Sequence, residues 1–300
     1  MSVIAQAGAK GRQLHKFGGS SLADAKCYLR VAGIMKEYSQ AGDMMVVSAA
    51  GSTTNQLISW LKLSQSDRLA AHQVQQSLRR YQTELIGGLV EPAAADTLIA
   101  AFIHDLERLA GLLDGGVTEA VYAEVVGHGE VWSARLMAAV LNQLGMEAAW
   151  LDARAFLRAE RAAQPQVDEG LSYPLLQQLM AQHPNKRLVV TGFISRNQAG
   201  ETVLLGRNGS DYSATQIGAL AGASRVTIWS DVAGVYSADP RKVKDACLLP
   251  LLRLDEASEL ARLAAPVLHA RTLQPVSASD IDLQLRCSYT PEQGSTRIER

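Results

Sequence analysis

The segment between residues 13 and 51 alternates apolar runs with glycine-rich turns, and this alternation limits the possible folds more than any other feature. Gln13–Phe17 predicts a strand, and residues 24–40 carry apolar side chains near helical spacing. Met44–Val47 is a second short apolar run, followed by a turn of small residues. A strand, a helix and another strand in this order are typical of two parallel strands joined by a crossover helix. We therefore expect a parallel sheet covered by helices.

The remainder of the chain continues this alternation. Two glycines flank His128 inside an otherwise helical stretch, and each costs roughly 1 kcal/mol within a helix. We therefore expect a break there, which would present Glu130 or His128 to a ligand. The other expected elements are mostly helical residues 56–113 and 117–144, strand-like residues 187–194 and 226–229, a hairpin around 197–200 with its second arm at 202–205, a helix over 211–221, a loop over 230–241, and continued alternation through 255–263, 266–273 and 281–286.

The size and charge of the chain narrow the class of protein. With 300 residues, the chain is long enough for one large α/β domain or two small ones. Hydrophobic residues make up 47% of the sequence and charged residues 20%, which indicates a globular protein. The formal net charge is −1, so neither a nucleic acid nor an anionic membrane is an expected partner. Any anion-binding site must therefore be local.

Cysteine usage and the start of the chain indicate a cellular compartment. Cys27, Cys247 and Cys287 are scattered and show no Cys-x-x-Cys spacing. This pattern argues against a disulfide framework or a zinc site and fits a reducing environment. The N-terminal residues lack the apolar core of a secretion signal, and no apolar run approaches the length of a membrane span. We therefore expect a cytoplasmic protein without a membrane partner.

Three turns combine small residues with hydroxyl groups: Gly18-Gly19-Ser20, Ser48-Ala49-Ala50-Gly51 and residues 206–210. Each turn alone has a simple alternative, which is a plain backbone turn. In a parallel sheet, however, such turns meet at one edge, where ligands bind. Their N–H groups and hydroxyls suit a phosphate, and Lys16 adds a positive charge. Together they predict a polyanion site, although no Walker pattern Gly-x-x-x-x-Gly-Lys-Ser/Thr occurs.

Several charged residues next to these turns are candidate ligands of a substrate, and each also has a structural alternative. Arg207 lies in the third turn, where it could clamp a carboxylate or remain a solvated surface arginine. Asp211 suits a helix N-cap, or it could orient Lys16 or hold Mg²⁺. Glu130 could be a helix-start carboxylate or the partner of a cationic substrate group. We interpret His128 as a histidine that satisfies backbone groups rather than as a base.

Read in chain order, the motifs resemble those of aspartate kinases of the amino-acid kinase superfamily, from about residue 12 to residue 290. The nearest resemblance is to the N-terminal kinase part of the bifunctional aspartokinase/homoserine dehydrogenases of the enterobacterial methionine-regulated type. The matching stretches are Lys16-Phe-Gly-Gly-Ser-Ser21, Val46-Val-Ser-Ala49 with Thr54-Asn55, Gly127-His-Gly-Glu130, Thr191-Gly-Phe-Ile194, Gly206-Arg-Asn-Gly-Ser-Asp-Tyr212, and Trp229-Ser-Asp231 through Asp239-Pro-Arg241.

This resemblance implies a three-layer α/β/α sandwich with a central, mainly parallel sheet. It implies a kinase domain over residues 12–290, with an aspartate-binding part at about 12–200 and a nucleotide-binding part at about 201–290. Residues 291–300 would begin a linker to downstream domains. The implied full-length protein is a homo-oligomer, a dimer, that also carries homoserine dehydrogenase. This chain itself contains no Gly-x-Gly-x-x-Gly dinucleotide motif.

The activity that the resemblance implies is ATP- and Mg²⁺-dependent phosphorylation of the β-carboxylate of L-aspartate. This reaction gives 4-phospho-L-aspartate, the first step of lysine, threonine and methionine biosynthesis. The implied catalytic residues are Lys16, which would stabilise the transferring phosphoryl group, and Asp211. The implied aspartate-binding residues are Thr54, Glu130, Arg207 and Ser210, and the implied ATP-binding residues are Lys16, Gly18, Gly19, Ser20, Ser48, Ser230, Asp231, Tyr236 and Arg241.

Two positions depart from the family pattern. Asn208 replaces a glycine of the third turn, and asparagine tolerates the left-handed backbone better than other residues with side chains. Pro266 stands where many relatives have a lysine that reaches the nucleotide phosphates, and Arg241, Lys242 or Lys244 could compensate. Other acceptors, such as another carboxylate, a carbamate or a nucleotide, also fit this fold. A third alternative is a kinase-fold binding or assembly module with low activity.

Overall fold

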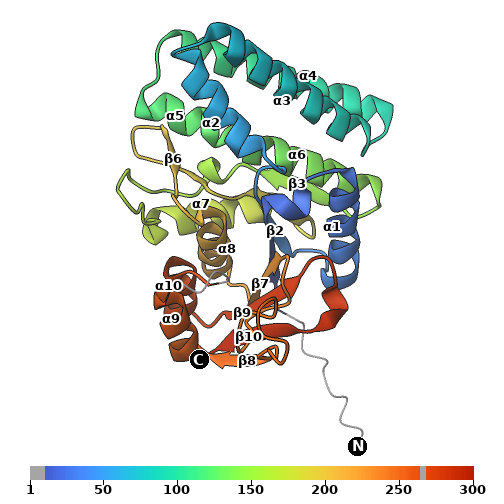
Figure 1. Ribbon diagram of the computed structural model, residues 1–300, viewed down its shortest axis with the longest axis vertical. Coiled ribbons are helices and arrows are strands. Elements are labelled where there is room, and N and C mark those ends of the chain that lie inside the picture. The colour runs from blue at the N-terminus through green and yellow to red at the C-terminus, as the bar shows by residue number, and fades with distance from the viewer. Residues whose placement is uncertain (1–10, 264–267) are drawn as a thin grey trace, which may run out of the picture.

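A computed structural model describes residues 11–263 and 268–300, and its centre is a mainly parallel sheet (Figure 1). The eight strands of this sheet lie in the order β3-β4-β2-β1-β7-β9-β10-β8, and only the β9–β10 pair is antiparallel. A separate hairpin pairs β5 (Ile194–Arg196) with β6 (Thr202–Leu204). The strands of the large sheet are β1 (Gln13–Phe17), β2 (Met44–Val47), β3 (Ala148–Leu151), β4 (Arg187–Thr191), β7 (Arg225–Ser230), β8 (Leu251–Arg253), β9 (Asp282–Cys287) and β10 (Ser295–Glu299).

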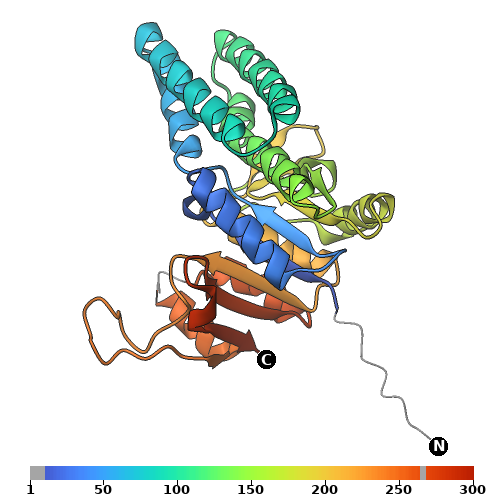
Figure 2. The same ribbon diagram turned by 90° about the vertical axis from the view of Figure 1, so that its right-hand side faces the viewer.

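Helices cover both faces of this sheet, which confirms the expected three-layer α/β/α architecture. Helices α1 and α6 pack on one face, and α7, α8 and α10 pack on the other. Helices α2 to α5 extend beyond the sheet at one end of the molecule (Figures 1 and 2). The helices are α1 (Ala25–Tyr38), α2 (Thr53–Ser64), α3 (Arg68–Gly87), α4 (Pro92–Asp114), α5 (Glu119–Val126), α6 (His128–Gln143), α7 (Glu169–Gln182), α8 (Gly209–Leu220), α9 (Leu254–Arg262) and α10 (Ala270–Ala278).

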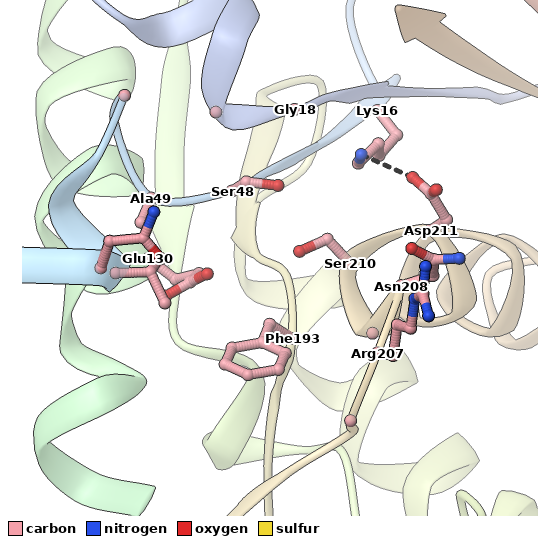
Figure 3. A pocket seen from close by; sticks show the side chains of 16 residues that line it. Lys16, Gly18, Ser48, Ala49, Glu130, Phe193, Arg207, Asn208, Ser210 and Asp211 are labelled. Atoms are coloured by element: carbon pink, nitrogen blue, oxygen red, sulfur yellow. Dashed lines mark ion pairs between the residues drawn. The ribbon is translucent and has the colours of Figure 1, made fainter. Parts of the chain in front are cut away.

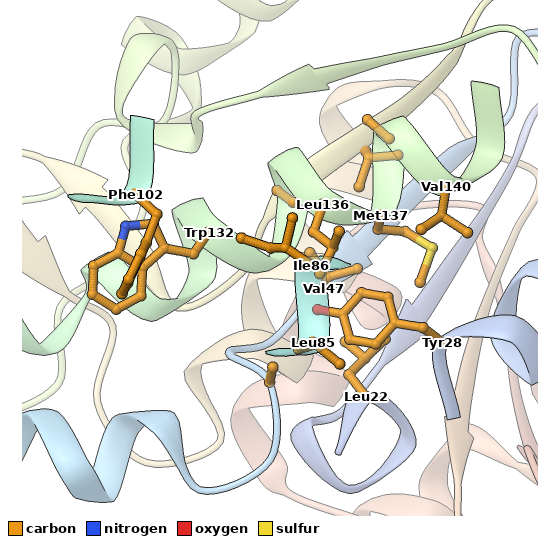
Figure 4. Packing of buried hydrophobic residues seen from close by; sticks show 14 of the residues in the cluster. Leu22, Tyr28, Val47, Leu85, Ile86, Phe102, Trp132, Leu136, Met137 and Val140 are labelled. Carbon is orange, nitrogen blue, oxygen red and sulfur yellow. The ribbon is translucent and has the colours of Figure 1, made fainter. Parts of the chain in front are cut away.

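The side chains of β1 alternate between two separate hydrophobic clusters. Phe17 packs with residues of α1 and α6, in the cluster that Figure 4 shows around Tyr28 and Met137. Leu14 belongs to the cluster under α8. Because successive side chains of a strand point to opposite faces, Lys16 points to the same face as Leu14, toward α8. The hydrophobic alternation of β1 therefore determines where its one lysine points.

The first strand–helix–strand unit matches the expectation, because its signals are local. β1 and β2 have the expected bounds, and α1 begins after Asp24, whose Oδ1 accepts a hydrogen bond from the Cys27 N–H at 2.7 Å. The expected break in the later helical stretch is also confirmed, since α5 ends at Val126 and α6 begins at His128. Among residues 11–263 and 268–300, no helix has both the length and the apolar character needed to cross a membrane.

Other parts of the chain differ from the expectation. The strand-like stretch 187–194 is two strands, because Gly192 and Phe193 turn the chain between β4 and β5. Strands β3 and β8 and helix α7 were not expected. Residues 291–300 were expected to begin a linker, but Ser295–Glu299 forms β10, which lies between β9 and β8 in the sheet. Because β10 pairs antiparallel with β9, residues 295–299 belong to the sheet of the folded domain.

Candidate functional site

A pocket of about 430 Å³ lies at the carboxyl ends of β1 and β2, facing the first turns of α6 and α8 (Figure 3). This is the edge at which open parallel sheets bind ligands. The pocket gathers the following predicted site residues: Lys16, Gly18, Gly19, Ser48, Thr54, Glu130, Arg207, Ser210 and Asp211. It is also lined by Ala49, Gly51, Asn55, Phe193, Gly206, Asn208 and Gly209.

Backbone contacts hold the first two turns together. The Ser48 N–H donates to the Phe17 carbonyl at 3.1 Å, and the Gly51 N–H donates to the Gly19 carbonyl at 3.0 Å. A Cβ atom at Gly19 would lie 2.8 Å from the Ala49 carbonyl oxygen, closer than any real contact of that kind. Glycine is therefore required at position 19 by close backbone approach. Gly18 and Gly19 of this turn both line the pocket.

Gly19→Ala is therefore expected to lower the free energy of unfolding by about 1–3 kcal/mol, because a backbone carbonyl must move to admit the new methyl group. Urea denaturation would measure this loss. Gly33→Ala is a matched control, since position 33 lies within α1 and a Cβ there meets no atom within 4 Å. That substitution should raise stability slightly, because alanine favours a helix more than glycine does. Equal stability of the two variants would contradict the steric argument.

Lys16 and Asp211 form a partly buried ion pair in the pocket. Lys16 Nζ lies 2.5 Å from Asp211 Oδ1, and the two side chains are 10% and 28% exposed. The N-cap of α8 is Asn208, with φ at 55°, so the N-cap alternative for Asp211 is wrong. Asn208 adopts the left-handed conformation that its replacement of glycine predicted. Asp211 instead pairs with the amine of Lys16 from the first turn of α8.

Glu130 is a buried carboxylate that faces the pocket from the first turn of α6. It is 3% exposed, and among the described residues no donor reaches its Oε2 atom. Burial raises the pKa of Glu130 from 4.5 to about 8, although the N–H groups of Glu130 and Ala49 oppose this shift. Arg207 lies across the pocket from Glu130 in Figure 3 and is exposed to solvent. The pocket therefore presents an unpaired acid on one side and a guanidinium on the other.

The raised pKa of Glu130 predicts a pH-dependent contribution to stability. The folded chain holds a proton on Glu130 that the unfolded chain releases above pH 4.5. Its contribution is therefore full below about pH 4.5 and is lost as the pH rises toward 8. We expect Glu130→Gln to gain stability relative to the parent chain as pH rises from 5 to 8. Urea midpoints of both chains at each pH give this difference, and a pH-independent difference would refute the prediction.

The residues around His128 explain how the start of α6 is held. His128 Nε2 lies 3.4 Å from Asp105 Oδ2, and its Nδ1 lies 3.7 Å from Glu124 Oε1. Burial opposes ionisation of Asp105, but His128 and Arg135 outweigh it and lower the pKa of this carboxyl to about 2. His128 therefore contacts carboxylates, whereas the sequence interpretation expected it to satisfy backbone groups. Of the two residues that the break could present, Glu130 alone lines the pocket.

Five predicted nucleotide-binding residues do not line this pocket: Ser20, Ser230, Asp231, Tyr236 and Arg241. Ser230 ends β7, the strand beside β1, so it lies at the same edge of the sheet. Arg241 is exposed and pairs with Asp239 at 3.1 Å. Their contact with a nucleotide remains a prediction. Pro266 lies outside the described residues.

Phe193 is a pocket residue that the sequence reasoning did not single out. Its φ of 66° is unusual for a side chain of this size. Its N–H donates to the Ser213 hydroxyl oxygen at 3.2 Å, and its carbonyl accepts the Leu205 N–H at 2.8 Å. The only sequence signal for it was its place within the Thr191-Gly-Phe-Ile194 motif. Backbone strain of this kind is often found at functional sites.

Comparison of the chain with models of known protein families shows to which family it belongs. The model described as "Amino acid kinase family" matches residues 11–287. The chain belongs to the amino acid kinase family. The match extends from β1 to the end of β9 and therefore includes every segment that lines the pocket of this family member.

Individual relatives agree with this assignment. The chain is 87% identical, over all its 300 residues, to bifunctional aspartokinase/homoserine dehydrogenase 2 of Escherichia coli, of which it spans 37%. It is 32% identical to lysine-sensitive aspartokinase 3 of E. coli, over 94% of this chain and 63% of that protein. The crystal structure of E. coli aspartokinase III with aspartate and ADP matches with a TM-score of 0.88 at 29% identity, over 96% of this chain and 64% of that chain.

Proposed function

We propose that this chain transfers the γ-phosphoryl group of ATP to the β-carboxylate of L-aspartate and so forms 4-phospho-L-aspartate. The observation that carries the proposal is the buried side chain of Glu130, whose Oε2 atom no donor of the described residues reaches, in the same pocket as Arg207, Lys16 and the glycine turns. An amino acid offers an ammonium group that Glu130 could bind and a carboxylate that Arg207 could bind. The similar E. coli structure, described as a complex with aspartate and ADP, supports this choice.

Aspartate would bind between the two sides of the pocket. Glu130 would take the α-ammonium group, because an adjacent cation favours the ionised carboxylate that burial disfavours. Arg207 would hold a carboxylate of the substrate, for which a planar guanidinium is well suited. Thr54 and Ser210 would supply further hydrogen bonds, since both side chains line the same pocket.

The phosphates of ATP would lie against residues 18–22, which we call the phosphate turn. Lys16 would neutralise charge on the transferring phosphoryl group, and Gly18, Gly19, Ser20 and Ser48 would donate hydrogen bonds to phosphate oxygens. Asp211 would keep the Lys16 amine in place. The substrate carboxylate is already ionised at neutral pH, so its in-line attack on the γ-phosphorus needs no general base.

The remainder of the nucleotide would contact residues 230–241, which we call the nucleotide loop. The residues proposed for this contact are Ser230, Asp231, Tyr236 and Arg241. Their support is the position of Ser230 at the end of β7, beside the strand that carries Lys16. Lys242 and Lys244 lie just after this loop and could add positive charge near the phosphates.

Mg²⁺ would enter with the nucleotide. Within residues 11–263 and 268–300, no group of three or more His, Cys, Asp or Glu side chains is arranged to hold a metal ion. Mg²⁺ fits this arrangement, because proteins usually bind it through one or two carboxylates plus substrate phosphates. Asp211, partly exposed in the pocket, is the candidate carboxylate. Bound Mg²⁺ would neutralise charge on the phosphate oxygens.

The longer protein is also part of the proposal, because the chain spans only 37% of the E. coli bifunctional relative. We propose that residues 12–200 mainly bind aspartate and that residues 201–290 mainly bind the nucleotide, although Arg207 and Ser210 reach the aspartate side. The full-length protein would be a cytoplasmic homo-oligomer, a dimer, with homoserine dehydrogenase activity and a role in lysine, threonine and methionine biosynthesis.

A coupled assay of ADP release, combined with hydroxylamine trapping of the acyl phosphate, tests the proposed reaction. L-Aspartate should support turnover that requires Mg²⁺, whereas L-glutamate, carbamate and a nucleoside monophosphate should not. Turnover with one of those acceptors but not with aspartate would replace the substrate. Calorimetric binding of Mg·ATP without any turnover would instead favour the binding or assembly module.

A further inference from the structure

Residues 287–289, at the end of β9, contact two segments that come from distant parts of the chain. One is the phosphate turn after β1, and the other is the start of the nucleotide loop after β7. In the sheet, β9 lies beside β7 and is separated by β7 from β1. Any contact between β9 and the phosphate turn must therefore cross the end of β7.

Ser288 makes this crossing with both its backbone and its side chain. Its N–H donates to the Ser230 carbonyl at 2.8 Å, and its hydroxyl lies 3.0 Å from the same oxygen. Its Oγ also lies 2.9 Å from Ser21 Oγ. The side chains of Ser21 and Ser288 are both fully buried, at 0% exposure. We call Ser21, Ser288 and Ser230 the serine bridge.

The direction of each hydrogen bond in the serine bridge follows from simple chemistry. A carbonyl oxygen only accepts, so the Ser288 hydroxyl must donate to Ser230. The Ser288 oxygen is then left to accept, so the Ser21 hydroxyl must donate to it. The bridge is therefore a directed chain from the phosphate turn through β9 to the nucleotide loop. Because the Ser21 and Ser288 side chains are fully buried, we expect that solvent does not replace a hydroxyl that is removed.

The neighbours of Ser288 repeat the same connection more weakly. Cys287 Sγ lies 3.5 Å from the Asp231 carbonyl oxygen, and the Tyr289 hydroxyl lies 3.4 Å from the Ser20 carbonyl oxygen. The Arg30 guanidinium covers the Tyr289 ring at 4.0 Å from its centroid. The strongest and most buried contact of this segment is therefore the one that Ser288 makes.

We propose that Ser288 is a positioning residue, which fixes the phosphate turn and the nucleotide loop at the separation that one bound nucleotide requires. This inference rests on the proposed function, because that function gives both segments the same ligand. Ser288 lies outside the pocket, so its effect would pass through Ser21 and Ser230. Its loss should weaken nucleotide binding and leave aspartate binding unchanged, since the bridge does not include Glu130 or Arg207.

Calorimetric titration with Mg·ADP tests this inference directly. Ser21→Ala should weaken Mg·ADP binding by about 5-fold, the usual net effect of one buried hydrogen bond. Ser288→Ala should weaken it by at least as much, because it also removes the hydroxyl bond to the Ser230 carbonyl. The double variant should bind little more weakly than Ser288→Ala, because that substitution has already removed the bond that Ser21→Ala removes. If Ser288→Ala fails to fold, Ser21→Ala still removes that bond from the other side. In steady-state assays, the KM for ATP should rise with the same fold-change and the KM for aspartate should not.

Ser172→Ala provides a matched control, since Ser172 is also fully buried but lies on α7, outside the pocket. Its hydroxyl oxygen accepts the Arg158 N–H at 2.9 Å, so it too removes one buried hydrogen bond. It should leave Mg·ADP affinity unchanged. Unchanged affinity in Ser288→Ala and Ser21→Ala, or an equal loss in Ser172→Ala, would overturn the positioning role.

The same measurements separate this inference from the proposed function. A parent chain that binds Mg·ADP but does not phosphorylate aspartate would refute the proposed reaction, and the calorimetry would still decide the role of the bridge. A parent chain that phosphorylates aspartate, with Mg·ADP affinity equal in all variants, would refute only the bridge. A parent chain that does not bind Mg·ADP would overturn both.

Discussion

Replacement of Lys16 by alanine is expected to lower the turnover number by about 100-fold or more while the chain remains folded. In the proposed reaction, the Lys16 amine, which pairs with Asp211 at 2.5 Å, would lie where charge develops on the transferring phosphoryl group. Losing one pre-organised donor of this kind typically adds about 3–4 kcal/mol to the barrier. The fold should survive because the Asp211 side chain is 28% exposed, so water can solvate its carboxylate. The coupled ADP-release assay measures the loss.

Lys36→Ala is the matched control for this prediction. Lys36 is an exposed lysine in the last turn of α1, outside the pocket, so its removal should leave turnover unchanged. Circular dichroism of both variants would confirm that each is folded. Near-normal turnover of Lys16→Ala would exclude the proposed role of this amine in phosphoryl transfer.

Glu130→Gln is expected to raise the KM for aspartate by about 100-fold, with little effect on the KM for ATP. Glutamine keeps the shape of the side chain but cannot supply the negative charge that an ammonium group requires. Removing one partner of a buried charge pair costs about 2–5 kcal/mol, which corresponds to at least a 30-fold loss in affinity. Initial-rate measurements in which each substrate is varied in turn give the two KM values.

The control for this substitution is Glu119→Gln, at an exposed position of α5. It removes one carboxylate charge from a residue that does not line the pocket and should change neither KM. An increase confined to the KM for ATP in Glu130→Gln would mean that Glu130 belongs to the nucleotide side of the site. Unchanged values of both would remove Glu130 from the substrate-binding residues.

The parts of the fold that the sequence predicts are those with local signals. Met44–Val47 is a continuous apolar run between turn residues, so its bounds follow from the residues alone. β10 has no such signal, because only Thr296 and Ile298 of this short strand are fully buried, and one of its two partners, β8, lies more than 40 residues earlier in the sequence. β3 has only four residues and lies at the edge of the sheet. Short edge strands depend on tertiary contacts that a local pattern does not contain.

The residues of the pocket also divide into those that local sequence signals predict and those that depend on tertiary contacts. The three glycine-rich turns could be placed at one edge from the order of strands and helices, and the structure brings them together. Phe193 could not be found in this way, because its left-handed backbone depends on contacts with residues of α8 and with Leu205. The isolation of Glu130 Oε2 was also hidden, since a sequence shows that a carboxylate is present but not whether a partner reaches it.

The alternation of side chains along β1 links the pairing of this strand to the chemistry proposed for the pocket. If β1 shifted by one residue against its neighbours, every side chain would exchange faces. The amine of Lys16 would then enter the apolar layer beneath α1, and the ring of Phe17 would turn toward Asp211. Such a molecule would bury an unpaired charge, which is costly enough to prevent it from accumulating. Correct assembly of the sheet and correct placement of the amine are therefore a single event in folding, so a folded but misregistered and inactive population is not expected.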